Sequence, residues 1–377
     1  MSLSDASERK FPNLKSVARS LAATNPTLRN VFMAGEAALN QVGTAVASVA
    51  PSMIRARPQK VTIAITAYCN LRCIGCRYGR DFMPGSQLDL DTVTRALDDA
   101  RAVGVETVRL YGGEPLLHPD LAAMVRHSVD LGLKTYVTTN GILLGRKIDS
   151  LYKSGLRSLS IGFYGMDDAY DSYVQRTNHF RHLRESLVAV RQRYGSEIHL
   201  QLNYLIMKPT VSLEALHAAW NFAETFDMSF HTDLVHYSLP YFTEGPDRIL
   251  QFSEEDRPAI EALTAELVRL KAVHPERMTD SIATLRSTTD WLLRGSDMRI
   301  PCDAGKLLWI GADGSVQLCY VTFPLGNLHT TSLRDMVLTK QHHDAARDAF
   351  LLNCPNCHCE RDCRVTKHAP SFIRYSL

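Results

Sequence analysis

The sequence has almost no charge excess and lacks the features that mark several protein classes. Its 377 residues include 42 basic and 40 acidic side chains, a formal net charge of +2. This balance indicates neither the basic surface typical of nucleic-acid binding nor an acidic tail. No uncharged apolar run reaches about 18 residues, the length expected of a transmembrane helix. Internal repeats and low-complexity tracts are also missing, which excludes a repeat architecture.

The cysteines do not follow the pattern of a disulfide-bonded secreted protein. Their number, nine, is odd, and most are separated by short spacings. Such spacings are typical of metal sites. The first residues lack the basic and then apolar pattern of a secretory signal, so we expect a protein of the reducing cytoplasm. The two groups of cysteines are Cys69, Cys73, Cys76 and Cys302, Cys319, Cys354, Cys357, Cys359, Cys363.

Regular alternation of strand and helix patterns predicts an α/β fold. Parallel strands covered by helices are the usual product of this alternation. We expect a partial (β/α)6 TIM-like barrel over 58–245, preceded by an N-terminal helical extension (1–57). A helical linker (246–299) and a small cluster-binding domain of a β-hairpin and helices (300–377) should follow. The expected strands are 61–65, 107–111, 134–138, 158–163, 199–206 and 229–235, and the expected helices are 91–103, 121–131, 147–154, 180–194, 213–226 and 253–273.

The N-terminal extension carries an apolar stripe at helical spacing. Its members are three or four residues apart and fall on one face of a helix. One interpretation packs this helix on the following domain. The other brings residues 30–54 to a membrane surface or a partner. The stripe consists of Leu39, Val42, Val46, Val49 and Met53.

Cys69, Cys73 and Cys76 lie in a loop directly after the first expected strand. In an α/β barrel this loop falls at the carboxyl ends of the strands, where catalytic residues gather. A structural zinc takes four protein ligands, whereas a [4Fe–4S] cluster held by three thiolates leaves one iron open. A zinc site completed by a distant fourth ligand and a set of unligated thiols are the alternatives.

This Cys-x3-Cys-x2-Cys spacing after a strand resembles the radical S-adenosylmethionine (radical SAM) superfamily. The resemblance implies that the amino and carboxylate groups of SAM chelate the open iron, and that reduction yields a 5′-deoxyadenosyl radical. In that family the residue before the third cysteine is usually aromatic and packs near the adenine. Here it is Gly75, so we expect adenine contacts from elsewhere. Tyr68, which precedes the first cysteine, is also assigned to the cofactor site.

Gly112, Gly113, Glu114 and Pro115 follow the second expected strand. Two glycines let the backbone approach a ligand closely, and the carboxylate beside them can pair with an ammonium group. A strand-to-loop turn would explain such a segment by itself. The resemblance implies that this segment binds the methionine part of SAM, with Glu114 on its amino group.

Four further residues are assigned to SAM. The resemblance implies roles for Thr139 and Asn140 at the end of the third strand, for Ser160 on the fourth, and for Arg176 as a partner of the SAM carboxylate. An ordinary turn and a solvated helix arginine are the competing interpretations. Asn203 alternates with apolar neighbours on the fifth strand, so its amide should point into the barrel and need a partner there, which the cofactor would supply.

His231, Asp233 and His236 lie on the last expected strand and just beyond it. Alternation puts His231 and Asp233 on one face, near the place where a substrate would bind. Each of the three side chains also fits an ordinary hydrogen-bonded or solvated role.

The C-terminal cysteines form a second set. Residues 307–310 and 315–319 predict a β-hairpin that begins near Cys302 and ends at Cys319. With the later Cys-x2-Cys-x5-Cys, the series resembles the SPASM and twitch extensions of radical SAM enzymes, which hold auxiliary [4Fe–4S] clusters. Two cysteines of the longer form are missing, one of them at Lys367. One auxiliary cluster is therefore expected.

Four cysteines are expected to bind the auxiliary cluster. They are Cys302, Cys319, Cys354 and Cys357. A set with Cys363 in place of Cys354 and a four-cysteine zinc ribbon remain alternatives. The spare thiols, Cys359 and Cys363, are candidate hydrogen-atom donors to a substrate radical.

Taken with the resemblance, these motifs predict an enzyme that removes a hydrogen atom from a substrate carbon. The expected outcome is dehydrogenation or epimerisation of a small molecule of sugar or aminocyclitol type, with a flavodoxin or ferredoxin-type protein as electron donor. A ribosomal-peptide maturase is one alternative. A non-catalytic iron–sulfur or zinc-binding protein is another.

Overall fold

A computed structural model describes residues 26–78, 81–236, 249–320 and 322–377, with side chains from residue 34 onward. The start of the expected N-terminal extension and residues 237–248, at the expected boundary between the barrel and the linker, lie outside these residues. Within the described part, no helix combines the length and the apolar character needed to cross a membrane.

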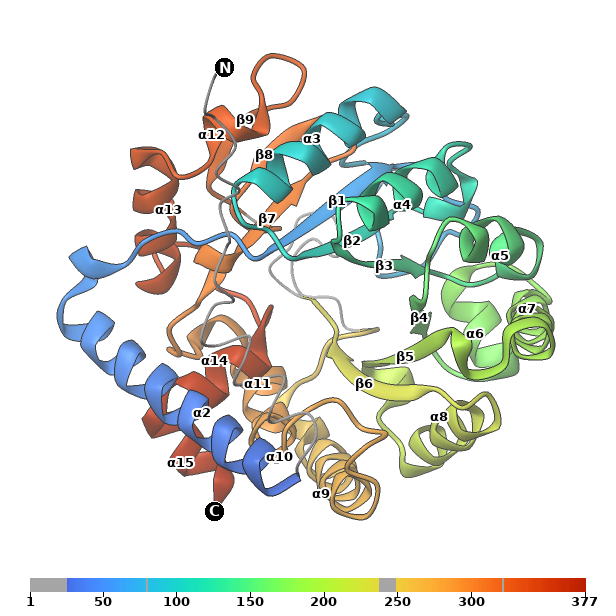
Figure 1. Ribbon diagram of the computed structural model, residues 1–377. Coiled ribbons are helices and arrows are strands. Elements are labelled where there is room, and N and C mark those ends of the chain that lie inside the picture. Colours follow the sequence, from blue (N-terminus) through green and yellow to red (C-terminus); the bar gives the residue numbers. More distant parts are fainter. Residues whose placement is uncertain (1–25, 79–80, 237–248, 321) are drawn as a thin grey trace, which may run out of the picture.

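One sheet organises the molecule (Figure 1). Its first six strands are parallel and follow the chain order, which confirms the partial (β/α)6 barrel. Helices cover the outer face. The strands are β1 (Lys60–Thr66), β2 (Thr107–Gly112), β3 (Lys134–Thr139), β4 (Ser158–Phe163), β5 (His199–Ile206) and β6 (Ser229–Leu234), and the covering helices are α3 (Leu90–Ala102), α4 (Leu121–Asp130), α5 (Leu144–Lys153), α6 (Asp167–Val174), α7 (His179–Tyr194) and α8 (Leu213–Thr225).

The local sequence explains these elements. β1 is buried at every position from Val61 to Thr66, as expected for a parallel strand covered on both faces. α3 begins after Asp89, whose carboxylate accepts a hydrogen bond from the backbone N–H of Thr92 at 2.6 Å. α6 was not predicted from the sequence, because it is short and lies directly beside an expected strand.

The predicted C-terminal hairpin exists, and it extends the barrel sheet. β7 (Leu307–Ile310) pairs in parallel with β1, and β8 (Ser315–Gln317) and β9 (Pro324–Asn327) continue the sheet in antiparallel pairing. The hairpin turn also packs on the cysteine loop, since the backbone N–H of Ala312 donates to the hydroxyl of Tyr78 at 3.4 Å. The two cysteine regions therefore lie on neighbouring strands of one sheet.

The remaining helices close the side of the molecule between β6 and β9 (Figure 1). They are α9 (Arg257–Val273), α10 (Ile282–Arg286), α11 (Thr288–Arg294), α12 (Leu333–Met336), α13 (Lys340–Phe350), α14 (Arg361–Lys367) and α15 (Ala369–Ser376). Short 3-10 helices are η1 (Pro51–Met53), η2 (Pro115–Leu117), η3 (Gly195–Glu197), η4 (Lys208–Thr210), η5 (Glu254–Asp256), η6 (Gly295–Asp297) and η7 (Ala304–Lys306).

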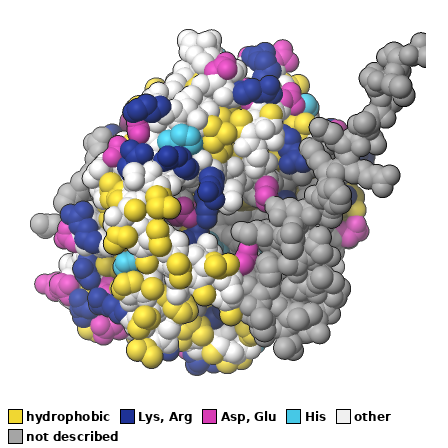
Figure 2. All heavy atoms as spheres, turned by 60° about the vertical axis from the view of Figure 1, so that its left-hand side comes forward, with side chains coloured by type: hydrophobic (Ala, Val, Ile, Leu, Met, Phe, Trp, Pro, Cys, Tyr) yellow, Lys and Arg dark blue, Asp and Glu magenta, His cyan; other side chains and the backbone are white. Residues whose placement is uncertain are grey.

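The N-terminal helix α2 (Pro26–Val49) packs with a different face from the one expected. The apolar stripe is exposed, by 61% at Val42 and 84% at Val49, and Figure 2 shows hydrophobic side chains gathered on this side of the molecule. α2 instead contacts α14 and α15. Its half-buried face carries Ala37, Gln41 and Thr44, and the Gln41 amide donates to the carbonyl of Thr366 in α14 at 3.1 Å. α2 therefore packs on the C-terminal helices, as one interpretation expected, but not through its apolar stripe.

Candidate functional site

Three half-buried thiols, those of Cys69, Cys73 and Cys76, lie in the loop after β1. The end of α6 holds this loop in place, because the backbone N–H of Ile74 donates to the carbonyl of Tyr173 at 3.0 Å. Burial raises the pKa of the Cys69 thiol to about 12. A thiolate at this position therefore needs a positive partner. Three cysteines on one loop, among them a buried thiol that needs such a partner, fit an iron–sulfur cluster.

The side chains of Leu250 and Tyr173 fill the space next to Gly75. A Cβ atom on Gly75 would lie 2.8 Å from Cδ1 of Leu250 and 3.1 Å from the hydroxyl of Tyr173. Tyr173 stacks on Tyr164 with ring centroids 4.6 Å apart. Position 75 lacks an aromatic side chain, but Tyr173 of α6 lies beside it and stacks on Tyr164 of the preceding loop.

The segment Gly112 to Pro115 clamps the start of the cysteine loop. The backbone N–H of Glu114 donates to the carbonyl of Tyr68 at 2.7 Å. A Cβ on Gly113 would lie 2.4 Å from that same carbonyl oxygen, so only glycine fits. Pro115 begins η2 and is buried, whereas Tyr68 is 53% exposed. The clamp fixes the distance between the loop and β2.

Glu114 lies at the centre of this arrangement with no exposed surface. Its Oε1 accepts from the hydroxyl of Thr139 at 2.6 Å and from the backbone N–H of Leu116 at 2.9 Å, and its Oε2 accepts from the backbone N–H of Asn140 at 2.8 Å. Burial raises its pKa to about 7, against the lowering effect of these hydrogen bonds. Since a carboxylate has about four acceptor positions, Oε2 can accept one more donor.

Asn140 also joins the end of β3 to the cysteine loop. Its side-chain amide donates to Oδ1 of Asn70, the residue after Cys69, at 2.9 Å. Thr139 and Asn140 therefore support Glu114 and the loop through direct hydrogen bonds.

A polar cavity of about 410 Å³ lies inside the barrel. Ser160 and Asn203 line it, as does Gln201. The Asn203 amide donates to Oγ of Ser160 at 2.6 Å, and its Oδ1 accepts from Gln201 at 2.7 Å. The side chain of Asn203 points into the barrel, as expected. Its hydrogen-bond partners are protein side chains on β4 and β5.

Arg109, on β2, is a cavity residue that the sequence did not suggest. Its guanidinium donates to the hydroxyls of Thr138 at 2.9 Å and Tyr320 at 3.0 Å, and it lies 4.9 Å from the ring of Tyr111. The sequence could have predicted this position, because strict alternation along β2 puts Arg109 and Tyr111 on the same face.

His231 and Asp233 line the cavity from the same face of β6, as expected. His231 lies 3.2 Å from the buried carboxylate of Asp280, which also pairs with Arg361 at 3.6 Å. Although burial acts in the opposite direction, Asp280 raises the pKa of His231. His236 lines the cavity too, and burial lowers its pKa to about 4.

Arg176 lies away from the cavity. It follows α6 on the exposed surface, and its Nη1 donates to the carbonyl of Gln175 at 3.0 Å. Ser160 and Asn203, which are also assigned to SAM, line this cavity, whereas Arg176 does not. Its role in binding SAM remains a prediction.

The C-terminal cysteines gather around a second, smaller cavity. Five of them line it, and Cys363 is not among these five. Burial raises the pKa of the Cys302 thiol to about 12, whereas a hydrogen bond from Cys359 lowers the pKa of Cys357 to about 7. Thiols this close to one another fit a shared metal centre. The five are Cys302, Cys319, Cys354, Cys357 and Cys359.

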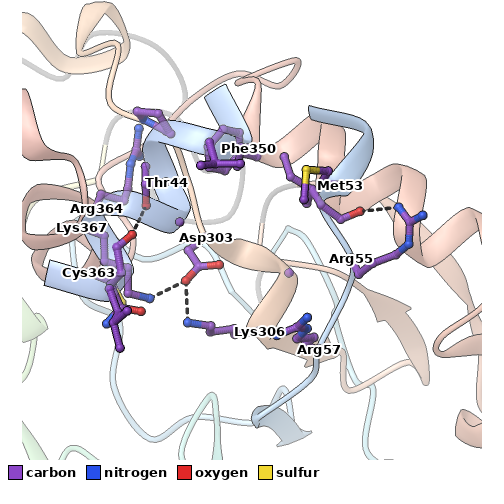
Figure 3. Close-up of a pocket in the computed structure, with 18 residues that line it drawn as sticks. Thr44, Met53, Arg55, Arg57, Asp303, Lys306, Phe350, Cys363, Arg364 and Lys367 are labelled. Carbon is purple, nitrogen blue, oxygen red and sulfur yellow. Dashed lines mark hydrogen bonds and ion pairs between the residues drawn. The ribbon is translucent and has the colours of Figure 1, made fainter. Parts of the chain in front are cut away.

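The two spare cysteines reach the barrel cavity. Cys359 lines both the five-cysteine cavity and the barrel cavity. Cys363 lies between the barrel cavity and a third hollow of about 410 Å³ under α2 (Figure 3). In that hollow Asp303 stands between Lys306, at 2.8 Å, and Lys367.

Comparison with known proteins agrees with this geometry. Residues 63–210 match the model of the radical SAM superfamily. Over 129 residues the chain is 33% identical to the GTP 3′,8-cyclase of Chlorobaculum tepidum, covering 34% of this chain and 39% of that protein. Over 154 residues it is 28% identical to the AdoMet-dependent heme synthase of Methanosarcina barkeri, covering 40% and 43%. The chain thus matches less than half the length of these relatives.

Solved structures share the fold over most of the chain. The structure of anSMEcpe with bound AdoMet has a TM-score of 0.60 at 14% identity and covers 84% of this chain and 96% of that one. Streptococcus suis SuiB bound to S-adenosylmethionine has a TM-score of 0.60 at 16% identity, with 80% and 70% covered. The matched span includes the three-cysteine loop and the clamp at Glu114. Residues 63–210 of this chain are therefore similar to the radical SAM superfamily.

Proposed function

We propose that this protein cleaves SAM reductively and removes a hydrogen atom from a substrate carbon in the barrel cavity. One observation carries the proposal. The three-thiol loop and the buried carboxylate of Glu114 lie at the carboxyl ends of the strands, and the same barrel encloses a polar cavity that two further thiols line. In this proposal the radical forms at the three-thiol loop and reacts with a substrate in the neighbouring cavity of the same barrel.

The residues at the carboxyl ends would hold the cofactors. A [4Fe–4S] cluster bound by Cys69, Cys73 and Cys76 would supply the electron that breaks a carbon–sulfur bond of SAM. Glu114 offers the remaining acceptor position of Oε2 to the SAM ammonium group. The rings of Tyr164 and Tyr173 beside Gly75 offer the apolar surface that an adenine needs.

The second cysteine cavity suits one auxiliary cluster. Cys302, Cys319, Cys354 and Cys357 all line it, which supports the ligand set expected from the sequence over the set that includes Cys363. A [4Fe–4S] cluster there would accept the electron that a substrate radical loses on dehydrogenation. A flavodoxin or ferredoxin-type protein is the expected source of low-potential electrons.

The cavity supports a small molecule as the substrate. Its volume of about 410 Å³ lies within the range of small-molecule sites, roughly 300–1,000 Å³. Loss of a second electron and a proton from the substrate radical gives dehydrogenation, whereas return of a hydrogen atom from Cys359 or Cys363 gives epimerisation. A peptide that inserts one side chain is the alternative, and solved structures of the same fold include SuiB bound to its precursor peptide SuiA.

Anaerobic reconstitution tests the proposal. The protein is loaded with iron and sulfide, and then given SAM and dithionite. We expect about eight irons per chain, as two cubanes require, and formation of 5′-deoxyadenosine. Cys73→Ala should lose about four irons and all deoxyadenosine. Cys319→Ala should lose about four irons but keep some SAM cleavage.

Cys363→Ala is the matched control, since this thiol lies outside both proposed ligand sets and should leave the iron content unchanged. About one zinc per chain with no deoxyadenosine would refute the proposed radical SAM activity. About twelve irons would refute the ligand assignment. Once a substrate is found, solvent deuterium in an inverted product would establish epimerisation and exclude simple dehydrogenation.

A further inference from the structure

Asp233, His236 and His358 come together on the wall of the barrel cavity. Each offers one potential ligand atom, and these atoms all lie within 4.8 Å of one another. Asp233 is on β6 and His236 follows it, whereas His358 comes from the segment that carries the C-terminal cysteines. Residues more than a hundred positions apart thus place two imidazoles and a carboxylate at one point.

The orientation of His358 suits metal binding. Its ring is buried, and Nε2 lies 3.1 Å from the carbonyl oxygen of Leu234. Since a carbonyl only accepts, Nε2 carries the proton and the lone pair is on Nδ1. Metal-binding histidines usually have this arrangement, in which the second ring nitrogen donates to a backbone carbonyl and fixes the ring.

The three side chains can close on an ion with small movements. The rings of His236 and His358 have centroids 4.2 Å apart. Metal–nitrogen and metal–oxygen bonds of about 2.0–2.2 Å require ligand atoms that are roughly 3–3.5 Å apart. The exposed carboxylate of Asp233 can supply much of this approach by rotation about its side-chain bonds.

We propose that Asp233, His236 and His358 bind a divalent first-row metal ion, separate from both iron–sulfur clusters. Two histidines and one carboxylate on one side of an ion leave its other positions open. These positions face the cavity, where an ion can hold a substrate through two neighbouring oxygen or nitrogen atoms. Vicinal diols, amino alcohols and hydroxy acids have such atoms. These substrate classes rest on the proposed function, whereas binding of the ion does not.

Zinc binding to the fully reconstituted protein provides the test. The holoprotein is dialysed anaerobically against Zn²⁺ and then against a weak chelator, and zinc and iron are counted by mass spectrometry. Zinc-edge X-ray absorption reports the ligand type without interference from iron. We expect about one zinc per chain with nitrogen and oxygen neighbours at about 2.0–2.1 Å.

Variants locate the site. His236→Gln and Asp233→Asn should each weaken zinc binding by more than about tenfold, with iron unchanged. His231→Gln is the matched control, because His231 lines the same cavity but pairs with Asp280, and it should retain zinc. Absence of zinc, sulfur neighbours at about 2.3 Å, or equal loss in all three variants would overturn the site. Deoxyadenosine measured on the same sample separates the two proposals, since a protein that cleaves SAM but binds no zinc refutes the metal site alone.

Discussion

Glu114 is a buried carboxyl group whose ionisation opposes folding. Burial raises its pKa from 4.5 to about 7. The folded state therefore binds the proton more tightly than the unfolded state does. The associated stability is fully present below about pH 4.5 and is lost as the pH rises toward about 7.

We predict that Glu114→Gln flattens this pH dependence. An amide does not titrate, so the variant should lack a change of roughly 3 kcal/mol between about pH 4.5 and 7. The free energy of unfolding of both proteins in urea, measured anaerobically at several pH values, checks this. Equal slopes would show that Glu114 is not the source.

Gly75 offers a second test at the scale of one residue. Gly75→Ala should destabilise the protein by about 1–3 kcal/mol, because the new Cβ would lie 2.8 Å from Leu250. Leu250→Ala in the same chain should recover part of that loss. Gly43→Ala is the control, since nothing lies within 4 Å of its Cβ position in α2, and it should stabilise by about 0.5–1 kcal/mol. A neutral Gly75→Ala would contradict the packing described for Tyr173 and Leu250.

Single positions were predictable from the sequence where a strand alternates strictly. Asn203 was placed inside the barrel in this way, but Arg109 and Gln201 were not recognised, although they obey the same period. His358 was not predicted as a site residue, because it lies between two cysteines that were assigned to cluster binding or hydrogen transfer. Its neighbour His236 precedes it by more than a hundred residues, and no local pattern encodes such a meeting.

At the scale of elements, a buried charge network ties α14 to β6. Arg361 donates to the carbonyl of Thr232 at 2.9 Å and to the hydroxyl of Thr288 at 3.0 Å, and it pairs with Asp280. Although burial acts to raise it, the charges of His231 and Arg361 hold the pKa of Asp280 down at about 2. The network fixes the C-terminal cysteine segment on the barrel.

Arg361→Met should therefore lower the free energy of unfolding by about 3–5 kcal/mol, because it leaves a buried carboxylate without its guanidinium partner. The double variant Arg361→Met/Asp280→Asn should lose less than the sum of the single losses. Arg374→Met is the control, since the exposed Arg374 pairs with Asp290 at 2.8 Å and should cost no more than about 1 kcal/mol. Similar urea denaturation curves for Arg361→Met and Arg374→Met would contradict the network.

Most elements were predictable because their periodicity is strong, and the six barrel strands agree with the expected ones to within one residue at each end. α2 shows the limit. Its apolar stripe predicted the packed face, yet the half-buried face is a different one, from which Gln41 hydrogen-bonds Thr366 in α14. The choice between two faces of a helix depends on the surface opposite, which the helix sequence does not contain.

At the scale of the whole molecule, the exposed stripe on α2 has a measurable consequence. Val42→Ser and Val49→Ser should each change the free energy of unfolding by less than about 0.5 kcal/mol. Leu267→Ala, at a fully buried position of α9, should cost about 2–5 kcal/mol. Losses above about 1.5 kcal/mol at the stripe would show that it is covered in solution, and repeating the measurement at two protein concentrations would reveal whether a second copy covers it.

The pairing of β1 with β7 also has a consequence for how the chain folds during synthesis. Lys60 pairs with Leu307, so one side of the first barrel strand stays unpaired until the ribosome has made most of the chain. At about 5–20 residues per second this delay is roughly 12–50 s. During that time the open strand edge can pair with other nascent chains. Slower translation should therefore lower the soluble yield, and chaperones that shield strand edges should restore it.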